Sequence, residues 1–222
     1  MQRKCEAYKF NHRVHWFRLA LARRDWPAAL QHANQFPKDK ITASYLRALV
    51  YLKKGDFERA RPEVHVLQGA YQTNRAKKEL EQRLWLVQGL LLCSTGSADS
   101  GLQMLQKLVQ RTKDDYGLHS WGHGAYFMEY WGLAALRANR LAVAEEAFLE
   151  ALAHDARSVR GALGMFVVCD RQGRNEEAQR FAELAQRCWR NADSGAIEAE
   201  LDYFRSQGSA KPTTSVETKG TR

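Results

Sequence analysis

The sequence predicts an all-α fold built from repeated pairs of helices. Three observations carry this prediction. Apolar residues recur at helical spacing along nearly the whole chain, alternating apolar and polar stretches are almost absent, and only four prolines interrupt the 222 residues. Because 45% of the residues are hydrophobic, the chain has enough apolar material for one substantial core. We therefore expect one folded unit that is nearly all helix.

Four residues mark expected helix ends along the chain. Gly55, Gly96, Asn139 and Gly173 each follow an apolar run. Gly and Asn accept best the left-handed backbone conformation that lies just beyond a helix. We therefore expect a tight turn between two helices at each of these positions.

The sequence after the last two of these ends repeats itself. Ala144 and Ala151 return as Ala178 and Ala185, each 34 residues later. Small residues at fixed places let two helices approach closely, so a fixed period indicates one helical hairpin copied along the chain.

A family resemblance becomes specific in the same region. Trp131-Gly132 in a first helix, followed by Ala144, Phe148 and Ala151 in a second, match the W-x2-L-G and A-x3-F patterns of the tetratricopeptide repeat family. The chain resembles that family most clearly over residues 41–190. The resemblance implies a right-handed α-solenoid of about five antiparallel helix pairs with a C-terminal capping helix.

Earlier units follow the same pattern less regularly. The unit around Gly89 is offset by 41 residues from the one around Ala48 and by 43 from the one around Gly132, and Asp25-Trp26 resembles Asp56-Phe57 at an offset of 31. We therefore expect five helix pairs over about residues 7–190, the first of them degenerate. Residues expected to pack at the helix crossings are Ala48, Ala60, Gly89, Gly101, Gly132, Ala144, Phe148, Ala151, Ala178 and Ala185.

Three residues depart from the pattern of the family. Phe166 stands where a small residue is usual, Pro62 falls inside a second helix and is expected to bend it, and Ala156 replaces the closing proline.

The end of the chain has two parts. Residues 196–205 carry a single apolar stripe of Ile197, Leu201 and Phe204, which suits a helix that caps the last repeat. From Gln207 onward the chain is rich in Ser, Thr, Gly and Lys and has little to bury. We expect a repeat domain over residues 1–206 and a disordered tail over 207–222.

The resemblance also implies a function, that of a non-catalytic scaffold that binds a protein or peptide on its concave face. In that family the first helix of each pair lines this face. An alternative for the leucines among the expected residues is that they belong to the core, because the helical count is uncertain by a residue or two. The residues expected on the face are Tyr45, Leu49, Arg83, Leu86, Tyr126, Glu129, Leu133, Arg160, Leu163 and Asp170.

One histidine cluster offers an alternative function. His119 and His123 are four residues apart, with Asp114 and Asp115 upstream and Glu129 downstream, and such a set resembles metal ligands. Nearby glycines make this stretch a poor helix, however, so a loop between repeats is favoured over a metal site. The sequence also has no Gly-rich phosphate loop and no nucleophile elbow. We expect no catalysis and no cofactor.

The charge of the chain leaves another alternative open. Lys and Arg number 34 against 25 Asp and Glu, a formal net charge of +9, and residues 1–24 hold seven basic residues against Glu6 alone. RNA binding through this basic N-terminal segment competes with the simpler interpretation of a solvated helix face. A homo-oligomer formed through the groove overlaps with the scaffold hypothesis.

Cysteine usage and hydropathy bear on location. The four cysteines are far apart and lack metal-ligand spacing, so reduced thiols are expected. The first residues lack the apolar core of a secretory signal, and no run of 18 apolar residues suits a membrane span. These features predict a cytoplasmic protein without membrane insertion.

Overall fold

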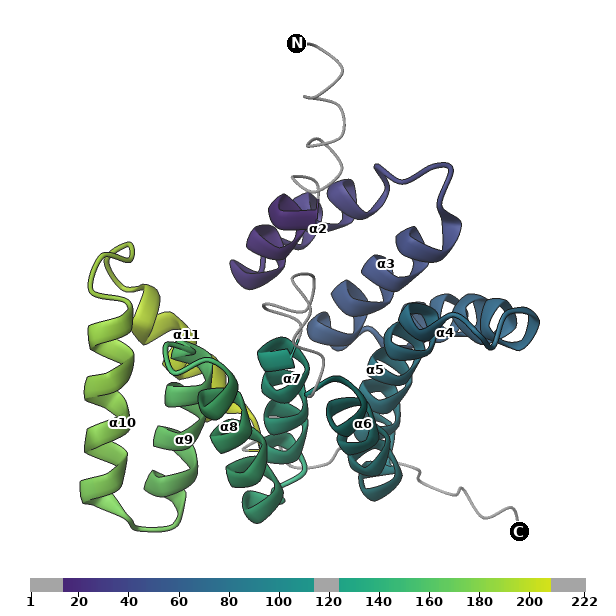
Figure 1. The fold of residues 1–222 in the computed structure, drawn as a ribbon. Coiled ribbons are helices and arrows are strands. Elements are labelled where there is room, and N and C mark those ends of the chain that lie inside the picture. Colours follow the sequence, from purple (N-terminus) through teal and green to yellow (C-terminus); the bar gives the residue numbers. More distant parts are fainter. Residues whose placement is uncertain (1–13, 114–123, 209–222) are drawn as a thin grey trace, which may run out of the picture. The chain divides into compact units, whose positions relative to one another are not determined.

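The computed structural model describes residues 14–113 and 124–208, which form helices joined by short turns and contain no β-strand (Figure 1). The predicted all-α class is thereby confirmed for this part of the chain. The helices span residues 14–22 and then α2 (Trp26–Ala33), α3 (Lys40–Lys54), α4 (Phe57–Thr73), α5 (Lys78–Ser94), α6 (Ala98–Thr112), α7 (Gly124–Arg137), α8 (Leu141–His154), α9 (Val159–Arg171), α10 (Asn175–Cys188) and α11 (Ala196–Ser206).

The chain divides into two compact units. The first is Met1–Arg111 and the second is Thr112–Arg222. Helices up to α6, apart from its last residue, belong to the first unit, and α7 to α11 belong to the second. The expectation of one repeat domain over residues 1–206 stays a prediction.

Four turns between helices share one geometry at the predicted helix ends. Gly55, Gly96 and Gly173 have φ values of +81°, +100° and +74°, and Asn139 has +54°. At each turn the N–H of the next residue donates to the carbonyl oxygen five residues before it, at 2.9–3.0 Å. This bond satisfies a carbonyl group that the helix end would otherwise leave without a partner. The four predicted helix ends are confirmed.

A fifth turn of the same kind follows the helix over residues 14–22. Arg24 has a φ of +58°, and Asp25 N–H donates to the carbonyl oxygen of Ala20 at 3.0 Å. The degenerate N-terminal hairpin expected at Asp25-Trp26 is therefore present in the described residues. An arginine holds the place that glycine or asparagine holds at the other four turns, although an L side chain makes this conformation less favourable.

Small residues set the separation of the helices. All ten residues expected at the crossings are buried. A Cβ atom built on Gly132 would lie 2.5 Å from the Phe148 ring, and one built on Gly164 would also lie 2.5 Å from that ring. Phe148 of α8 is therefore held between the backbones of α7 and α9. The family pattern has a small residue where this chain has Phe166. In the structure Gly164, two positions before Phe166, is the small residue at this crossing.

Consecutive hairpins pack through their first helices within each unit. In the second unit α7 packs on α8 and α9, and α9 packs on α10. In the first unit α3 packs on α4 and α5 in the same order. α4 runs without interruption from Phe57 to Thr73 with Pro62 inside it. None of the helices in the described segments is both long enough and apolar enough to cross a membrane.

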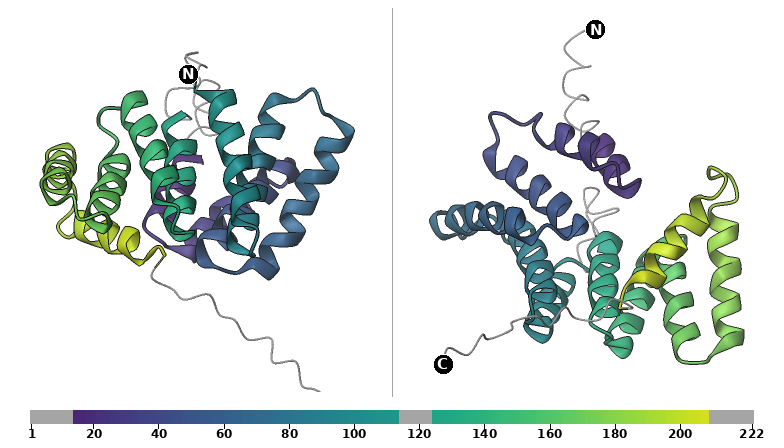
Figure 2. Two further views of the ribbon diagram at one scale, coloured as in Figure 1. Left: turned by 90° about the horizontal axis from the view of Figure 1, so that it is seen from below. Right: turned by 180° about the vertical axis from the view of Figure 1, so that it is seen from behind.

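The C-terminal helix packs on the second unit by a face that differs in part from the expected one. α11 lies against α9 (Figure 2). Phe204 is fully buried as predicted, but Glu200 is buried as well, whereas Ile197 and Leu201 are only half-buried. The buried face is turned toward Glu200 because this carboxylate forms an ion pair with Arg160 of α9.

The last described residues are ordered against the same unit. Gln207, where the disordered tail was expected to begin, is buried and accepts two hydrogen bonds from Arg137 of α7, at 2.8 and 3.1 Å. Residues 209–222 of the expected tail lie outside the described residues.

Candidate partner-binding faces

Each unit has a face built from the first helices of two successive hairpins. In the first unit α3 and α5 form the α3/α5 face, which carries Tyr45 and Arg83. In the second unit α7 and α9 form the α7/α9 face, which carries Glu129 and Arg160. The ten residues that the sequence placed on a binding surface all lie on these four helices.

The four expected leucines lie in the core. Leu49, Leu86, Leu133 and Leu163 are 0–6% exposed, so they offer almost no surface to a partner. Counting helical positions along the sequence could not tell whether these leucines lie in the core or on the binding face. Their burial agrees with the alternative that these leucines belong to the core. The polar and aromatic members remain accessible to a greater degree: Asp170 is exposed, and Tyr45, Arg83, Tyr126, Glu129 and Arg160 are half-buried.

Arg83 organises the α3/α5 face. Its guanidinium lies over the Tyr45 ring, 5.5 Å from the centroid, and donates to the hydroxyl oxygen of Thr42 at 2.8 Å. It also forms an ion pair with Glu79 of its own helix, whose side chain is 75% exposed. Cation–π contact and charge-assisted hydrogen bonds thus fix one arginine between two first helices.

Asp39 supports this arrangement from the N-terminus of α3. Its carboxylate accepts hydrogen bonds from the Thr42 amide at 3.0 Å and the Thr42 hydroxyl at 2.5 Å. Burial raises the pKa of Asp39, but the bonds from Thr42 and the charge of Arg83 lower it by more, so the net shift is downward. Asp39 therefore caps α3 and holds Thr42 in place for Arg83.

Arg160 has the corresponding role on the α7/α9 face. Its side chain is 19% exposed and lies between Glu129 of α7, at 3.3 Å, and Glu200 of α11, at 3.1 Å. Glu129 also accepts a hydrogen bond from Ser158 at 2.9 Å. Burial lowers the pKa of Arg160, but the two carboxylates raise it by more, so the guanidinium stays charged.

The two arginines occupy equivalent places in the two units. Arg83 lies thirteen residues before the turn at Gly96, and Arg160 lies thirteen residues before the turn at Gly173. Their neighbours on the preceding first helix, Tyr45 and Glu129, each lie ten residues before their own turn. The same pair of positions therefore makes a cation–π contact in one unit and an ion pair in the other.

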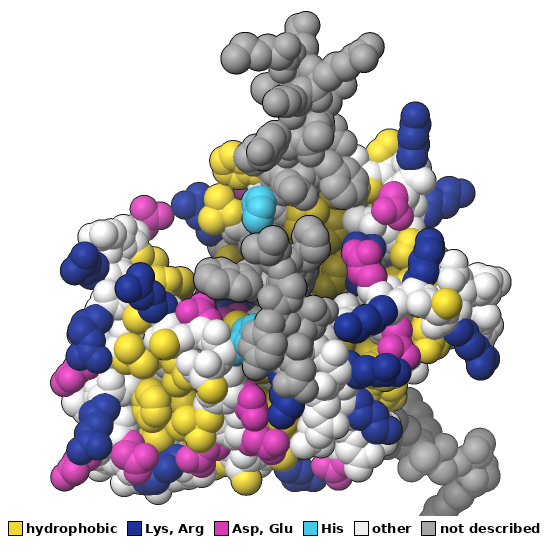
Figure 3. Space-filling model, viewed as in Figure 1, with side chains coloured by type: hydrophobic (Ala, Val, Ile, Leu, Met, Phe, Trp, Pro, Cys, Tyr) yellow, Lys and Arg dark blue, Asp and Glu magenta, His cyan; other side chains and the backbone are white. Residues whose placement is uncertain are grey.

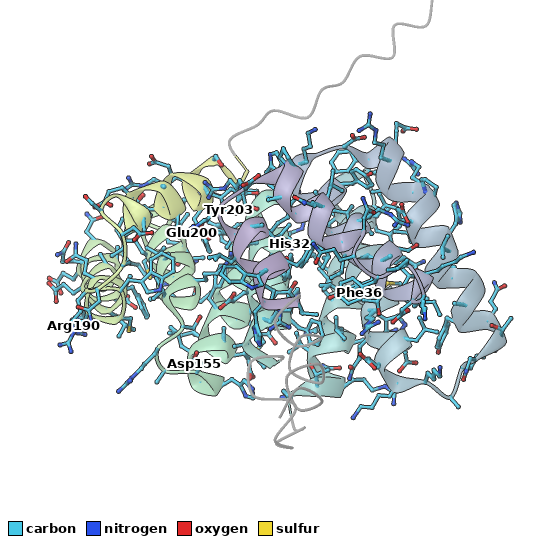
Figure 4. The ribbon with its side chains drawn as sticks, turned by 90° about the horizontal axis from the view of Figure 1, so that it is seen from above. His32, Phe36, Asp155, Arg190, Glu200 and Tyr203 are labelled. Carbon is cyan, nitrogen blue, oxygen red and sulfur yellow. The ribbon has the colours of Figure 1, made fainter. Side chains whose placement is uncertain are left out.

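A third helix completes the α7/α9 face. Phe204 of α11 is fully buried, with its ring centroid 5.9 Å from that of Phe148. The guanidinium of Arg160 lies over the Phe204 ring, 5.6 Å from its centroid. Figure 4 labels Glu200 and Tyr203 on this helix. α11 thus places the Glu200 carboxylate and the Phe204 ring, four residues apart, against Arg160.

The end of α11 is tied to both first helices. Arg171 of α9 donates to the carbonyl oxygens of Leu136, at 3.4 Å, and of Arg205, at 3.1 Å, and also to that of Gln207. Arg137 of α7 donates to the Gln207 side chain. The α7/α9 face therefore accepts a helix along its length.

Sequence reasoning placed α11 as a terminal cap and did not assign Glu200, Phe204 and Gln207 to the binding face. The spacing of Glu200 and Phe204 puts both on one side of a helix, which is the one signal that the sequence carried. Their partner Arg160 lies forty residues before Glu200, too far for any local pattern to connect them.

The suggested metal cluster falls largely outside the described residues, which omit Asp114, Asp115, His119 and His123. Glu129, the member that is described, is bonded to Ser158 and Arg160. Within residues 14–113 and 124–208, no three His, Cys, Asp or Glu side chains come together as a metal site would need.

No protein-family model matches the chain, and a search of curated proteins found no match.

Proposed function

We propose that the chain is a non-catalytic scaffold of the tetratricopeptide type, a helical solenoid that binds a protein segment on its first-helix faces. The observation that carries the proposal is the position of α11. A helix of the chain itself lies on the α7/α9 face through an ion pair with Arg160 and a buried aromatic ring. Helix-in-groove binding of this kind is a recurring mode of peptide recognition.

The repeated geometry supports the solenoid part of the proposal. Five turns have left-handed backbone at the residue that ends the first helix, and a buried Ala or Gly lies five residues after each of them. One hairpin design thus recurs five times in the described residues. A stack of such hairpins generates extended faces without building a catalytic site.

The α3/α5 face is the proposed partner site of the first unit. Arg and Tyr are the residue types most enriched among those that dominate binding energy at protein interfaces. Within the described residues, Arg83 bonds to residues of α3 and α5, and its Glu79 partner is mostly exposed. A partner carboxylate can replace Glu79 at Arg83 without leaving any buried charge unpaired.

The arrangement favours a protein over a nucleic acid as the partner. Arg160 is neutralised by two glutamates, and Arg83 lies close to Asp39 and Glu79. In the view of Figure 3, Asp and Glu side chains are interspersed among the Lys and Arg side chains. Phosphate-dominated binding needs several unpaired basic groups along a track.

Affinity capture with the full chain tests the proposal. Proteins retained from a native-cell extract by the wild-type chain should be lost with Arg83→Ala and with Tyr45→Ala. They should remain with Arg59→Ala, which removes a largely exposed arginine of α4 that forms an ion pair with Asp56. Equal retention by all three variants, or retention that disappears after nuclease treatment, would contradict the proposal.

A further inference from the structure

We propose that the α7/α9 face is a helix-binding site that α11 occupies within its own chain, and that a partner protein's helix with a glutamate four residues before a phenylalanine binds there in exchange for α11. This inference rests on the proposed function and names the partner's chemistry at the second unit.

The chemistry of the partner follows from the occupant that the structure shows. Glu200 and Phe204 lie on one side of α11, with the carboxylate 3.1 Å from Arg160 and the ring fully buried. Phe148, fixed between Gly132 and Gly164, presents the ring that Phe204 contacts. A helix with the same two side chains at the same spacing finds the same two contacts.

α11 is attached to the rest of its unit by a connection that permits release. It has only 11 residues and no side-chain cap at its N-terminus. Isolated helices shorter than about 12–15 residues are marginal in water, so α11 depends on the face for its helical form. Residues 190–195, which join it to α10, are all exposed. α11 can therefore leave the face without disturbing the turn between α9 and α10.

The polar contacts favour exchange over simple opening. Among the described residues, removing α11 would leave Arg160 with Glu129 as its one carboxylate partner, and losing one partner of a buried ion pair is costly. A partner glutamate restores the lost contact. Arg160 Nε lies 3.3 Å from Glu129 but makes no aligned hydrogen bond. The attraction between these charges therefore depends on distance more than on bond direction, and a carboxylate of slightly different geometry can take part in it.

The first unit shows that the equivalent position does not require a third helix for its bonds. Arg83 reaches Thr42, Tyr45 and Glu79, all within α3 and α5. The arginine at this position of a hairpin pair can thus be satisfied by its own two helices. In the second unit, the ion pair between Arg160 and Glu200 of α11 is therefore additional to the contacts that α7 and α9 make with each other.

A cleavable full-length chain tests the exchange. A specific protease site replaces residues 190–194, so that cutting leaves α11 bound without a covalent link. The probe is a fluorescent synthetic peptide of residues 195–208. We expect the cut chain to take up the peptide, and the uncut chain to bind it about tenfold or more weakly. Peptides with Glu200→Gln or Phe204→Ala should bind the cut chain about tenfold or more weakly, as usual when one partner of a buried charge pair or an interface anchor is truncated.

A variant of the uncut chain guards against disruption by cutting. Glu200→Gln weakens the internal contact while Arg160 and Phe148 stay in place, and it should raise the affinity of the uncut chain for the wild-type peptide. The proposal is overturned if the cut chain loses the helical signal of the repeats, since α11 is then a structural part. Equal binding of all three peptides, or no uptake by either the cut chain or Glu200→Gln, overturns it as well. These results leave the Arg83→Ala capture untouched, so failure here is distinct from failure of the proposed function.

Discussion

At the scale of single residues, the packing of the second unit depends on the Phe148 ring. Gly132 and Gly164 approach the ring from two helices, so a Cβ atom on either residue would collide with it. The motif in the sequence predicted the places of Gly132 and Phe148, because small-and-aromatic pairs at helix crossings are local signals. Gly164 was not predicted, since the family pattern directed attention to Phe166.

Gly132→Ala tests this packing. The added Cβ atom would lie 2.5 Å from the ring, so the variant should lose about 1–3 kcal/mol of unfolding free energy through overpacking. Urea titration measures the loss. Gly69→Ala is the control, because an added Cβ atom there meets nothing within 4 Å. Alanine is the better helix former, and the control should gain up to about 1 kcal/mol. A stable Gly132→Ala variant would show that Phe148 is not confined.

Asp39 carries a prediction about pH. The folded-state pKa of Asp39 lies below its usual 3.8, so its contribution to stability is present above that pH and is lost as pH falls through the folded value. Asp39→Ala should therefore cost about 1 kcal/mol at pH 7, the usual effect of losing an N-cap, and progressively less in acid.

The control for this prediction is Asp39→Asn, which keeps a capping oxygen and does not titrate. The difference in unfolding free energy between the Asn and Ala variants should stay constant with pH. A constant difference between the wild type and Asp39→Ala down to acid pH would refute the assigned role of the carboxylate.

At the scale of elements, the recurring turn was the most predictable feature. Gly and Asn after an apolar run indicated four turns because few residues accept a positive φ. Arg24 could not be read in this way, since arginine seldom adopts that conformation, and only the similarity of Asp25-Trp26 to Asp56-Phe57 indicated the fifth turn.

Substitutions at Asn139 test the turn directly. Asn139→Gly should leave the melting temperature nearly unchanged, because glycine also accepts the φ of +54°. Asn139→Val should destabilise the protein by about 1–2 kcal/mol, since a β-branched residue is strained in this conformation. Thermal unfolding followed by circular dichroism compares the two. Equal effects would mean that the left-handed turn is not needed.

The C-terminal helix shows the limit of reasoning from periodicity. Its apolar stripe predicted a helix and a buried Phe204, but the burial of Glu200 depends on an arginine in α9. Hydrophobic spacing records which face is apolar and does not record a carboxylate whose partner lies far away in sequence. The four leucines expected on the binding face lie in the core for a related reason, because a shift of one residue in the helical count moves a side chain from the surface to the core.

At the scale of the whole molecule, the described residues form two units built on the same hairpin, each with an arginine at the same place on its first-helix face. α11 contacts the face of the second unit. The proposed binding of a protein segment would account for these features together, and it predicts that the α3/α5 face touches a polypeptide in the cell.

Photo-crosslinking from the α3/α5 face tests this central claim most directly. The full chain carries a photoreactive benzoylphenylalanine in place of Tyr45, or in place of Val66, an exposed residue of α4. After irradiation in a native-cell extract, the Tyr45 position should give a discrete protein adduct that Arg83→Ala abolishes and that the Val66 position does not form. Adducts that are identical at both positions, or that contain nucleic acid, would contradict a protein-binding face between α3 and α5.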